Sequence, residues 1–148
     1  MRRIALILVV PWLLALAAVP AARADDAPPA LPAPDRAAIR AVIGAQIDAF
    51  RHDDGVRAFG YASPGIRAQF GNAAAFLDMV RRGYAPVYRP RAYVFGPLTR
   101  TDGQIVQHVV LTGPDGVAEE ALYFMEHEKD GTWRIDGCML TAPAAVGA

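Results

Sequence analysis

The spacing of apolar residues in the first half of the chain predicts helices. After Asp35, a residue type that often caps a helix N-terminus, apolar side chains recur every three or four positions and cover about 140° of a helical wheel. This stripe consists of Ile39, Val42, Ile43, Ile47 and Phe50. We predict a first helix that ends near residues 53–56. Further helical turns are predicted after Ser63 and after Asn72, the last of them ending at a left-handed Gly83.

The second half of the chain alternates β-rich runs with turns. Three turn sequences with Asp-Gly at their centres separate four runs, at about residues 87–98, 104–112, 117–128 and 132–141. Asp-Gly favours tight hairpins, and such short connections allow only antiparallel neighbours. We therefore predict an α+β fold in which N-terminal helices pack on a four-stranded antiparallel sheet.

Both faces of this predicted sheet are apolar. In residues 104–112, Ile105 and Val109 point to one face, and Val106 and Val110 point to the other. A sheet that helices cover on one face only normally presents polar side chains on the other. The apolar outer face therefore favours a second covering, and we predict a homodimer formed through it. Coverage by edge loops or by the N-terminal segment is the alternative.

The first 24 residues have the pattern of a cleaved signal peptide. Arg2 and Arg3 precede an apolar run, residues 4–19, and an Ala-Arg-Ala cleavage site ends at Ala24. The run is shorter than the about 20 residues that a membrane-spanning helix needs. We predict export to the periplasm or beyond, cleavage after Ala24, and no membrane span in the mature chain.

The remaining residues are expected to form one domain with two flexible ends. Residues 25–34 are rich in proline and predict an extended, mobile leader. Residues 35–141 carry the predicted helices and strands and have the size of a single domain. Residues 142–148 predict a flexible tail.

Charge, cysteine and histidine content narrow the function classes. Without the three arginines of the signal, 12 basic residues remain against 15 acidic ones, a net charge of −3, which does not favour nucleic acid as a partner. The only cysteine, Cys138, cannot form an internal disulfide, and we interpret it as a small buried residue of the last strand. His52, His108 and His127 lack the spacing of converging metal ligands, so no metal site and no cofactor is predicted.

Gln46 is a polar residue within the apolar stripe of the first helix. A buried glutamine needs hydrogen-bond partners, because leaving it unpaired costs about 1–3 kcal/mol. The backbone of the fold is one source of partners. A ligand is the other, because pockets for small molecules place a few polar groups among apolar ones. Gln46 is therefore a candidate ligand-binding residue.

The segment at residues 81–91 contains four arginines, two tyrosines and two prolines, and no acidic residue. Its prolines predict an extended, stiff crossover from the last helix to the first strand. Tyr84 and Tyr88 can bury their rings while each hydroxyl keeps a partner. Arg89 and Arg91 point to the same side of an extended chain, and two guanidinium groups suit an anionic ligand or the acidic residues of the protein itself. We take all four as candidate ligand-binding residues.

The order of helices and strands resembles the nuclear transport factor 2-like cone, in which helices close the concave side of a curved antiparallel sheet. The final strand, which begins in "DGTWRIDGC", is similar to that of many such domains. Two stretches, "AQIDAFRHDDGVRAFGYASPGIRAQFG" and "FLDMVRRGYAPVYRPR", resemble domain of unknown function 4864, a family of small exported bacterial proteins without an assigned activity. In the ketosteroid-isomerase relatives, the segment that corresponds to residues 61–71 supplies an aspartate base. Here that segment contains neither Asp nor Glu.

These patterns favour a binding or assembly module without catalysis, with a cavity for a small apolar or anionic ligand between the first helix and the sheet. An enzyme of the isomerase, dehydratase or hydrolase type is the alternative, and Asp53, His108 and His127 are its only candidate acid–base residues. A third possibility is a structural partner protein that works through its apolar outer sheet face.

Overall fold

The computed structural model describes residues 30–142 of the chain. The predicted signal peptide, residues 25–29 of the predicted leader and residues 143–148 of the predicted tail lie outside the described residues. Residues 31–142 form one compact unit, in which five helices precede four strands. The elements are α1 (Ala33–Arg51), α2 (Gly55–Gly60), α3 (Pro64–Phe70), α4 (Ala73–Gly83), α5 (Ala85–Tyr88), β1 (Ala92–Thr101), β2 (Gln104–Thr112), β3 (Ala118–His127) and β4 (Trp133–Thr141).

The strands form an antiparallel meander in the order β1-β2-β3-β4. Asp102 and Gly103 connect β1 to β2, and both have positive φ angles, 48° and 82°. This is the geometry that an Asp-Gly pair favours in a two-residue hairpin. The two other turns each place a glycine at positive φ, Gly116 and Gly131. The predicted antiparallel sheet is thus confirmed.

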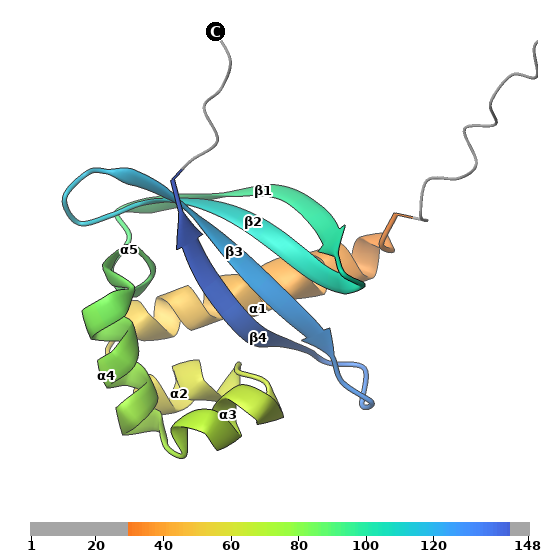
Figure 1. Ribbon diagram of the computed structural model, residues 1–148, viewed down its shortest axis with the longest axis horizontal. Helices are drawn as coiled ribbons and strands as arrows, with labels where there is room; N and C mark the ends of the chain where they lie inside the picture. The colour runs from red at the N-terminus through yellow and green to blue at the C-terminus, as the bar shows by residue number, and fades with distance from the viewer. Residues whose placement is uncertain (1–29, 143–148) are drawn as a thin grey trace, which may run out of the picture. The chain divides into compact units, whose positions relative to one another are not determined.

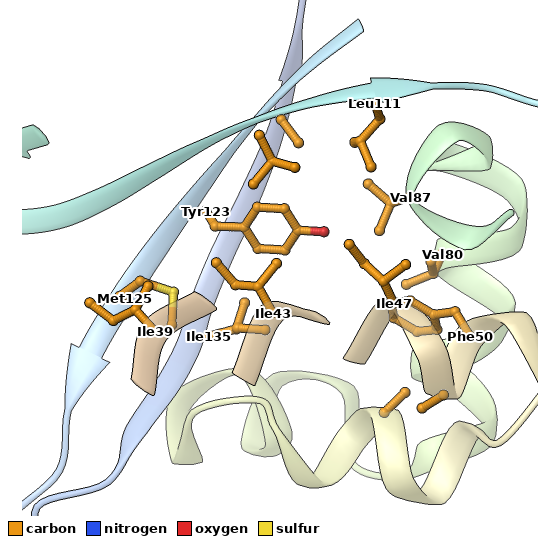
Figure 2. Close-up of a cluster of buried hydrophobic side chains, with 14 of the residues drawn as sticks. Ile39, Ile43, Ile47, Phe50, Val80, Val87, Leu111, Tyr123, Met125 and Ile135 are labelled. Carbon is orange, nitrogen blue, oxygen red and sulfur yellow. The ribbon is translucent and has the colours of Figure 1, made fainter. Parts of the chain in front are cut away.

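The helices cover one face of this sheet. In Figure 1, α1 runs along the sheet, while α2, α3 and α4 gather beside it near β4. The apolar stripe of α1 is buried: Figure 2 shows Ile39 and Ile43 on the side of the strands and Phe50 beside Val80 of α4. The sheet contributes Leu111, Tyr123, Met125 and Ile135 to the same core. The predicted α+β fold class is therefore confirmed.

The helix caps were partly predicted. The side chains of Ser63 and Asn72 accept hydrogen bonds at the N-termini of α3 and α4, as expected. Asp35 does not cap α1, because the helix already begins at Ala33 and the Asp35 carboxylate accepts a hydrogen bond from Trp133 Nε1 (3.1 Å). Gly83 is not left-handed; it is the last residue of α4, and the chain turns directly into α5.

The predicted extended crossover after α4 is also wrong. Residues 85–88 form the short helix α5, and β1 begins at Ala92 rather than at residue 87. Pro86 lies in the first turn of α5, where a helix needs no backbone N–H and the fixed φ of proline fits. Among the described residues, no helix is long and apolar enough to cross a membrane.

Candidate functional site

A cavity of about 190 Å³ lies between the helices and the last two strands. Its deeper wall comes from α1 and β3, and its outer wall includes the exposed Gln69 of α3. All of its lining residues are uncharged, and most are apolar. They are Gln46, Phe50, Ile66, Gln69, Phe70, Phe76, Met79, Val80, Tyr84, Val87, Tyr123, Ile135, Gly137 and Cys138.

Two of the predicted site residues, Gln46 and Tyr84, line this cavity. Gln46 is buried, and its Nε2 donates a hydrogen bond to the carbonyl oxygen of Ala58 in α2 (3.1 Å). The Tyr84 hydroxyl donates to the carbonyl oxygen of Cys138 in β4 (3.2 Å). Each side chain thus holds two elements together and also presents a polar group at the edge of an apolar space.

Tyr123 is a third polar residue of the cavity wall, and sequence reasoning did not single it out. The residue is fully buried, and its hydroxyl has no hydrogen-bond partner among the described residues. Figure 2 shows this hydroxyl directed toward Val87, which also lines the cavity. Burial raises the pKa of Tyr123 well above its usual value, so the phenol stays protonated. No local sequence pattern reveals such a group, because its isolation depends on neighbours from other elements.

Cys138 contributes a thiol to the same wall. It pairs with Tyr123 across β3 and β4, and the residue is partly exposed rather than fully buried as predicted. Burial of the thiol raises its pKa to about 12, so it carries no charge at neutral pH. A thiol with this pKa is a poor nucleophile, because the reactive species is the thiolate.

Tyr88 and Arg89 belong to a different cluster, centred on Asp53. Arg89 Nη2 donates to one carboxylate oxygen of Asp53 (2.7 Å), and Arg81 Nη2 donates to the other (3.3 Å). The Tyr88 hydroxyl donates to the same carboxylate. Desolvation works to raise the pKa of Asp53, but the hydrogen bonds and charges of Arg81 and Arg89 together hold it below its usual value. This cluster is exposed and none of its members lines the cavity.

Arg91 stands apart from both groups. Its backbone amide donates to Thr112 where β1 begins, and its side chain lies near the turn at Gly116. The structure therefore brings Gln46 and Tyr84 together at one cavity and Tyr88 and Arg89 together at Asp53. Arg89 and Arg91, which were predicted to point to the same side of an extended chain, have different neighbours: Arg89 contacts Asp53, and Arg91 lies near Gly116.

The candidate acid–base residues do not meet at the cavity either. Asp53 lies in the exposed cluster, and His127 stacks on the Trp133 ring with centroids 4.4 Å apart. His108 Nδ1 lies 2.9 Å from Glu120 on the sheet face opposite the helices, with Thr99 Oγ1 3.1 Å from its other ring nitrogen. Within residues 30–142, no three His, Cys, Asp or Glu side chains are arranged to hold a metal ion.

Comparison of the sequence with known proteins assigns this chain to a family. A search of curated proteins and a search of solved structures each found no match. A family model described as "Domain of unknown function (DUF4864)" matches residues 32–148, which include every element of the fold. The chain belongs to this family.

Proposed function

We propose that this protein is an exported binding module that holds a small, mostly apolar molecule in the cavity between its helices and its sheet. The observation that carries the proposal is the cavity itself, with an uncharged wall and a few polar side chains among apolar ones. Ligand sites in proteins commonly have this composition. The proposal includes export by the N-terminal signal and the cone-like arrangement of the nuclear transport factor 2-like group.

The size of the cavity supports a small ligand. Apolar cavities of about 150 Å³ stay dry and take up benzene. At about 190 Å³, this cavity suits a substituted aromatic ring or an aliphatic molecule of similar size. A larger ligand would have to extend past Gln69 toward solvent.

The distribution of charged residues around the cavity favours an apolar ligand over an anionic one. Arg89, the predicted anion-binding residue nearest the helices, already pairs with Asp53. The cavity wall contains no cation to replace the hydration of a carboxylate or phosphate. Burial of such a charge without a partner is strongly unfavourable.

Native mass spectrometry of the protein purified from its own host tests the proposal. We expect a retained small molecule, and a first residue of Asp25 if the signal is cleaved after Ala24. Met79→Trp should fill the cavity from its partly exposed wall and abolish retention. Val56→Trp is the matched control, because Val56 is exposed on α2 and does not line the cavity. A ligand-free wild-type protein that also fails to bind small aromatic compounds would rule out the binding role.

Assembly through the outer sheet face is a second candidate function. The register of the strands puts Val94, Val110 and Met139 on the face opposite the helices, and their exposed fractions are 68%, 38% and 51%. Three exposed apolar side chains on three strands favour a second copy of the chain as a cover.

Sedimentation equilibrium tests this assembly. The wild-type protein should sediment as a dimer at micromolar concentration, and Val110→Asp should sediment as a monomer. Val56→Asp places the same charge at an exposed valine on α2 and should leave the dimer intact. A wild-type protein that sediments as a monomer contradicts the proposal.

A further inference from the structure

We propose that the ligand is a neutral molecule with a hydrogen-bond acceptor, such as a carbonyl oxygen, which it presents to the hydroxyl of Tyr123. This inference rests on the proposed binding function and specifies the chemical class of the ligand. Its basis is the difference between the hydroxyl of Tyr123 and the other polar groups of the cavity wall.

Two of the other polar side chains of the wall, Gln46 and Tyr84, each already have one partner within the fold. Gln46 donates to Ala58, and the Tyr84 hydroxyl donates to Cys138. The Tyr123 hydroxyl, in contrast, is buried without a partner among the described residues. Buried polar groups are nearly always paired in native proteins, because an unpaired one costs about 1–3 kcal/mol. A buried, unpaired donor at a cavity wall is therefore a group that a ligand can satisfy.

The position of Tyr123 sets where the polar atom of the ligand would lie. Tyr123 belongs to β3 on the inner wall of the cavity, whereas the exposed Gln69 belongs to the outer wall. Its hydroxyl is directed toward Val87 and away from the sheet (Figure 2). The ligand would enter with its polar atom first and leave its apolar part among Phe70, Phe76 and Met79.

The protonation state of the cavity wall favours a ligand that is neutral and accepts a hydrogen bond. The buried phenol keeps its proton, and the pKa of the Cys138 thiol is raised to about 12. Both groups are thus uncharged at neutral pH and can donate hydrogen bonds. Since a phenol O–H is a stronger donor than its oxygen is an acceptor, a carbonyl suits it better than an amine or ammonium group.

A matched pair of probes tests this inference. Acetophenone and α-methylstyrene have the same shape and the same number of non-hydrogen atoms, and differ by a carbonyl oxygen in place of a methylene group. Isothermal titration calorimetry with the full mature chain should show tighter binding of acetophenone. Tyr123→Phe should weaken acetophenone binding about three- to tenfold, the effect of one neutral hydrogen bond, and leave α-methylstyrene binding unchanged.

The outcomes separate this inference from the proposed function. Equal binding of both probes to wild type and to Tyr123→Phe would overturn the role of Tyr123 while the cavity remains a binding site. Absence of binding by either probe would count against the cavity as a site for molecules of this size. The unchanged affinity of Tyr123→Phe for α-methylstyrene also shows that the variant is folded. Tyr61→Phe is the matched control, because Tyr61 is partly buried but does not line the cavity, and it should keep the preference for acetophenone.

Discussion

At the scale of single residues, the polar side chains of the interior differ in whether the fold itself satisfies them. The Nε2 of Gln107 donates to the carbonyl oxygens of Gly96, Pro97 and His108, and so ties β2 to the irregular part of β1, although its Oε1 is buried without a partner among the described residues. Ser63 accepts a bond from the α3 backbone and donates to Asp136. These groups stabilise the fold by what they connect. The hydroxyl of Tyr123 connects nothing, and its cost must be offset by the burial of its ring.

Removal of the unpaired hydroxyl should stabilise the ligand-free protein. We expect Tyr123→Phe to raise the free energy of unfolding by about 1 kcal/mol, because it removes a buried donor that has no acceptor. Tyr84→Phe should lower it by about 1 kcal/mol, because it breaks the bond to Cys138. Urea denaturation of the two variants measures both effects. Equal losses of stability in both variants would mean that Tyr123 also has a partner within the protein.

The carboxylate of Asp53 should make the free energy of unfolding depend on pH in the acid range. Because the folded state lowers its pKa, its contribution is present above the unfolded pKa and is lost as the pH falls through the folded pKa. Asp53→Asn, which can keep the positive φ angle of 57°, should reduce the loss of unfolding free energy between neutral pH and about pH 3. Asp54→Asn is the control, since Asp54 is exposed and caps α2. An identical pH dependence of the unfolding free energy in wild type and Asp53→Asn would mean that Arg81 and Arg89 do not lower the pKa of Asp53.

At the scale of elements, the small helices near β4 are held by specific caps. Ser63 accepts a hydrogen bond from the amide of Ile66 at the start of α3, and its hydroxyl donates to Asp136 of β4 (2.7 Å). Asn72 accepts one from Ala75 at the start of α4. Ser63 is fully buried whereas Asn72 is exposed, so the first cap also joins a helix to the sheet.

Loss of the two caps should therefore have unequal effects. Asn72→Ala should lower the free energy of unfolding by about 1 kcal/mol, the usual value of an N-cap. Ser63→Ala should lower it by about 2–3 kcal/mol, because the cap is lost and the Asp136 carboxylate also loses a donor. Thermal and urea unfolding of the two variants provide the comparison. Effects of equal size would show that the bond to Asp136 contributes little.

The elements that sequence predicted well depend on local chemistry. The Asp-Gly turns and the apolar period of α1 act within a few residues, so β2 and the α1 stripe were placed closely. The wrong predictions involve residues whose partners are distant in the sequence, or residues that fit more than one local structure. Asp35 has the chemistry of a cap, but a tryptophan 98 residues away takes its carboxylate. Pro86 is compatible with both an extended segment and a first helical turn, and only packing decides between them.

The same distinction applies to the candidate site. Gln46 could be found from sequence, because a polar residue in an apolar stripe of helical period is a local anomaly. Arg89 was recognised as a partner for acids, but nothing local identified Asp53 as that partner. Tyr123 looks like an ordinary core aromatic on a β-strand. Its unpaired hydroxyl becomes visible only when residues of α1, α5 and β4 surround it.

At the scale of the whole molecule, the sheet divides the protein into a covered side and an open side. The covered side holds the core and the uncharged cavity. The open side holds Val94, Val110, Met139 and the His108–Glu120 pair, which is partly buried. The two proposed functions therefore use opposite faces of one sheet, and variants of Met79 and of Val110 should separate them.

Burial of the Cys138 thiol should make the whole fold sensitive to alkaline pH. Its pKa of about 12 lies above the usual value of 9.0, so the folded state holds a proton that the unfolded chain releases. The stabilisation is complete below about pH 9 and is lost as the pH rises toward 12. Between about pH 8 and pH 11, the loss of this stabilisation should lower the free energy of unfolding by about 2–3 kcal/mol.

Comparison with Cys138→Ala isolates this contribution. The variant is less stable near neutral pH because it enlarges the cavity, but its unfolding free energy should fall less steeply between about pH 8 and pH 11. All other side chains are the same in both proteins, so their effects cancel in the difference. Urea unfolding at a series of pH values measures the two curves. Parallel curves would mean that the thiol reaches water in the folded state, and the cavity wall at β4 would then be more open than its geometry indicates.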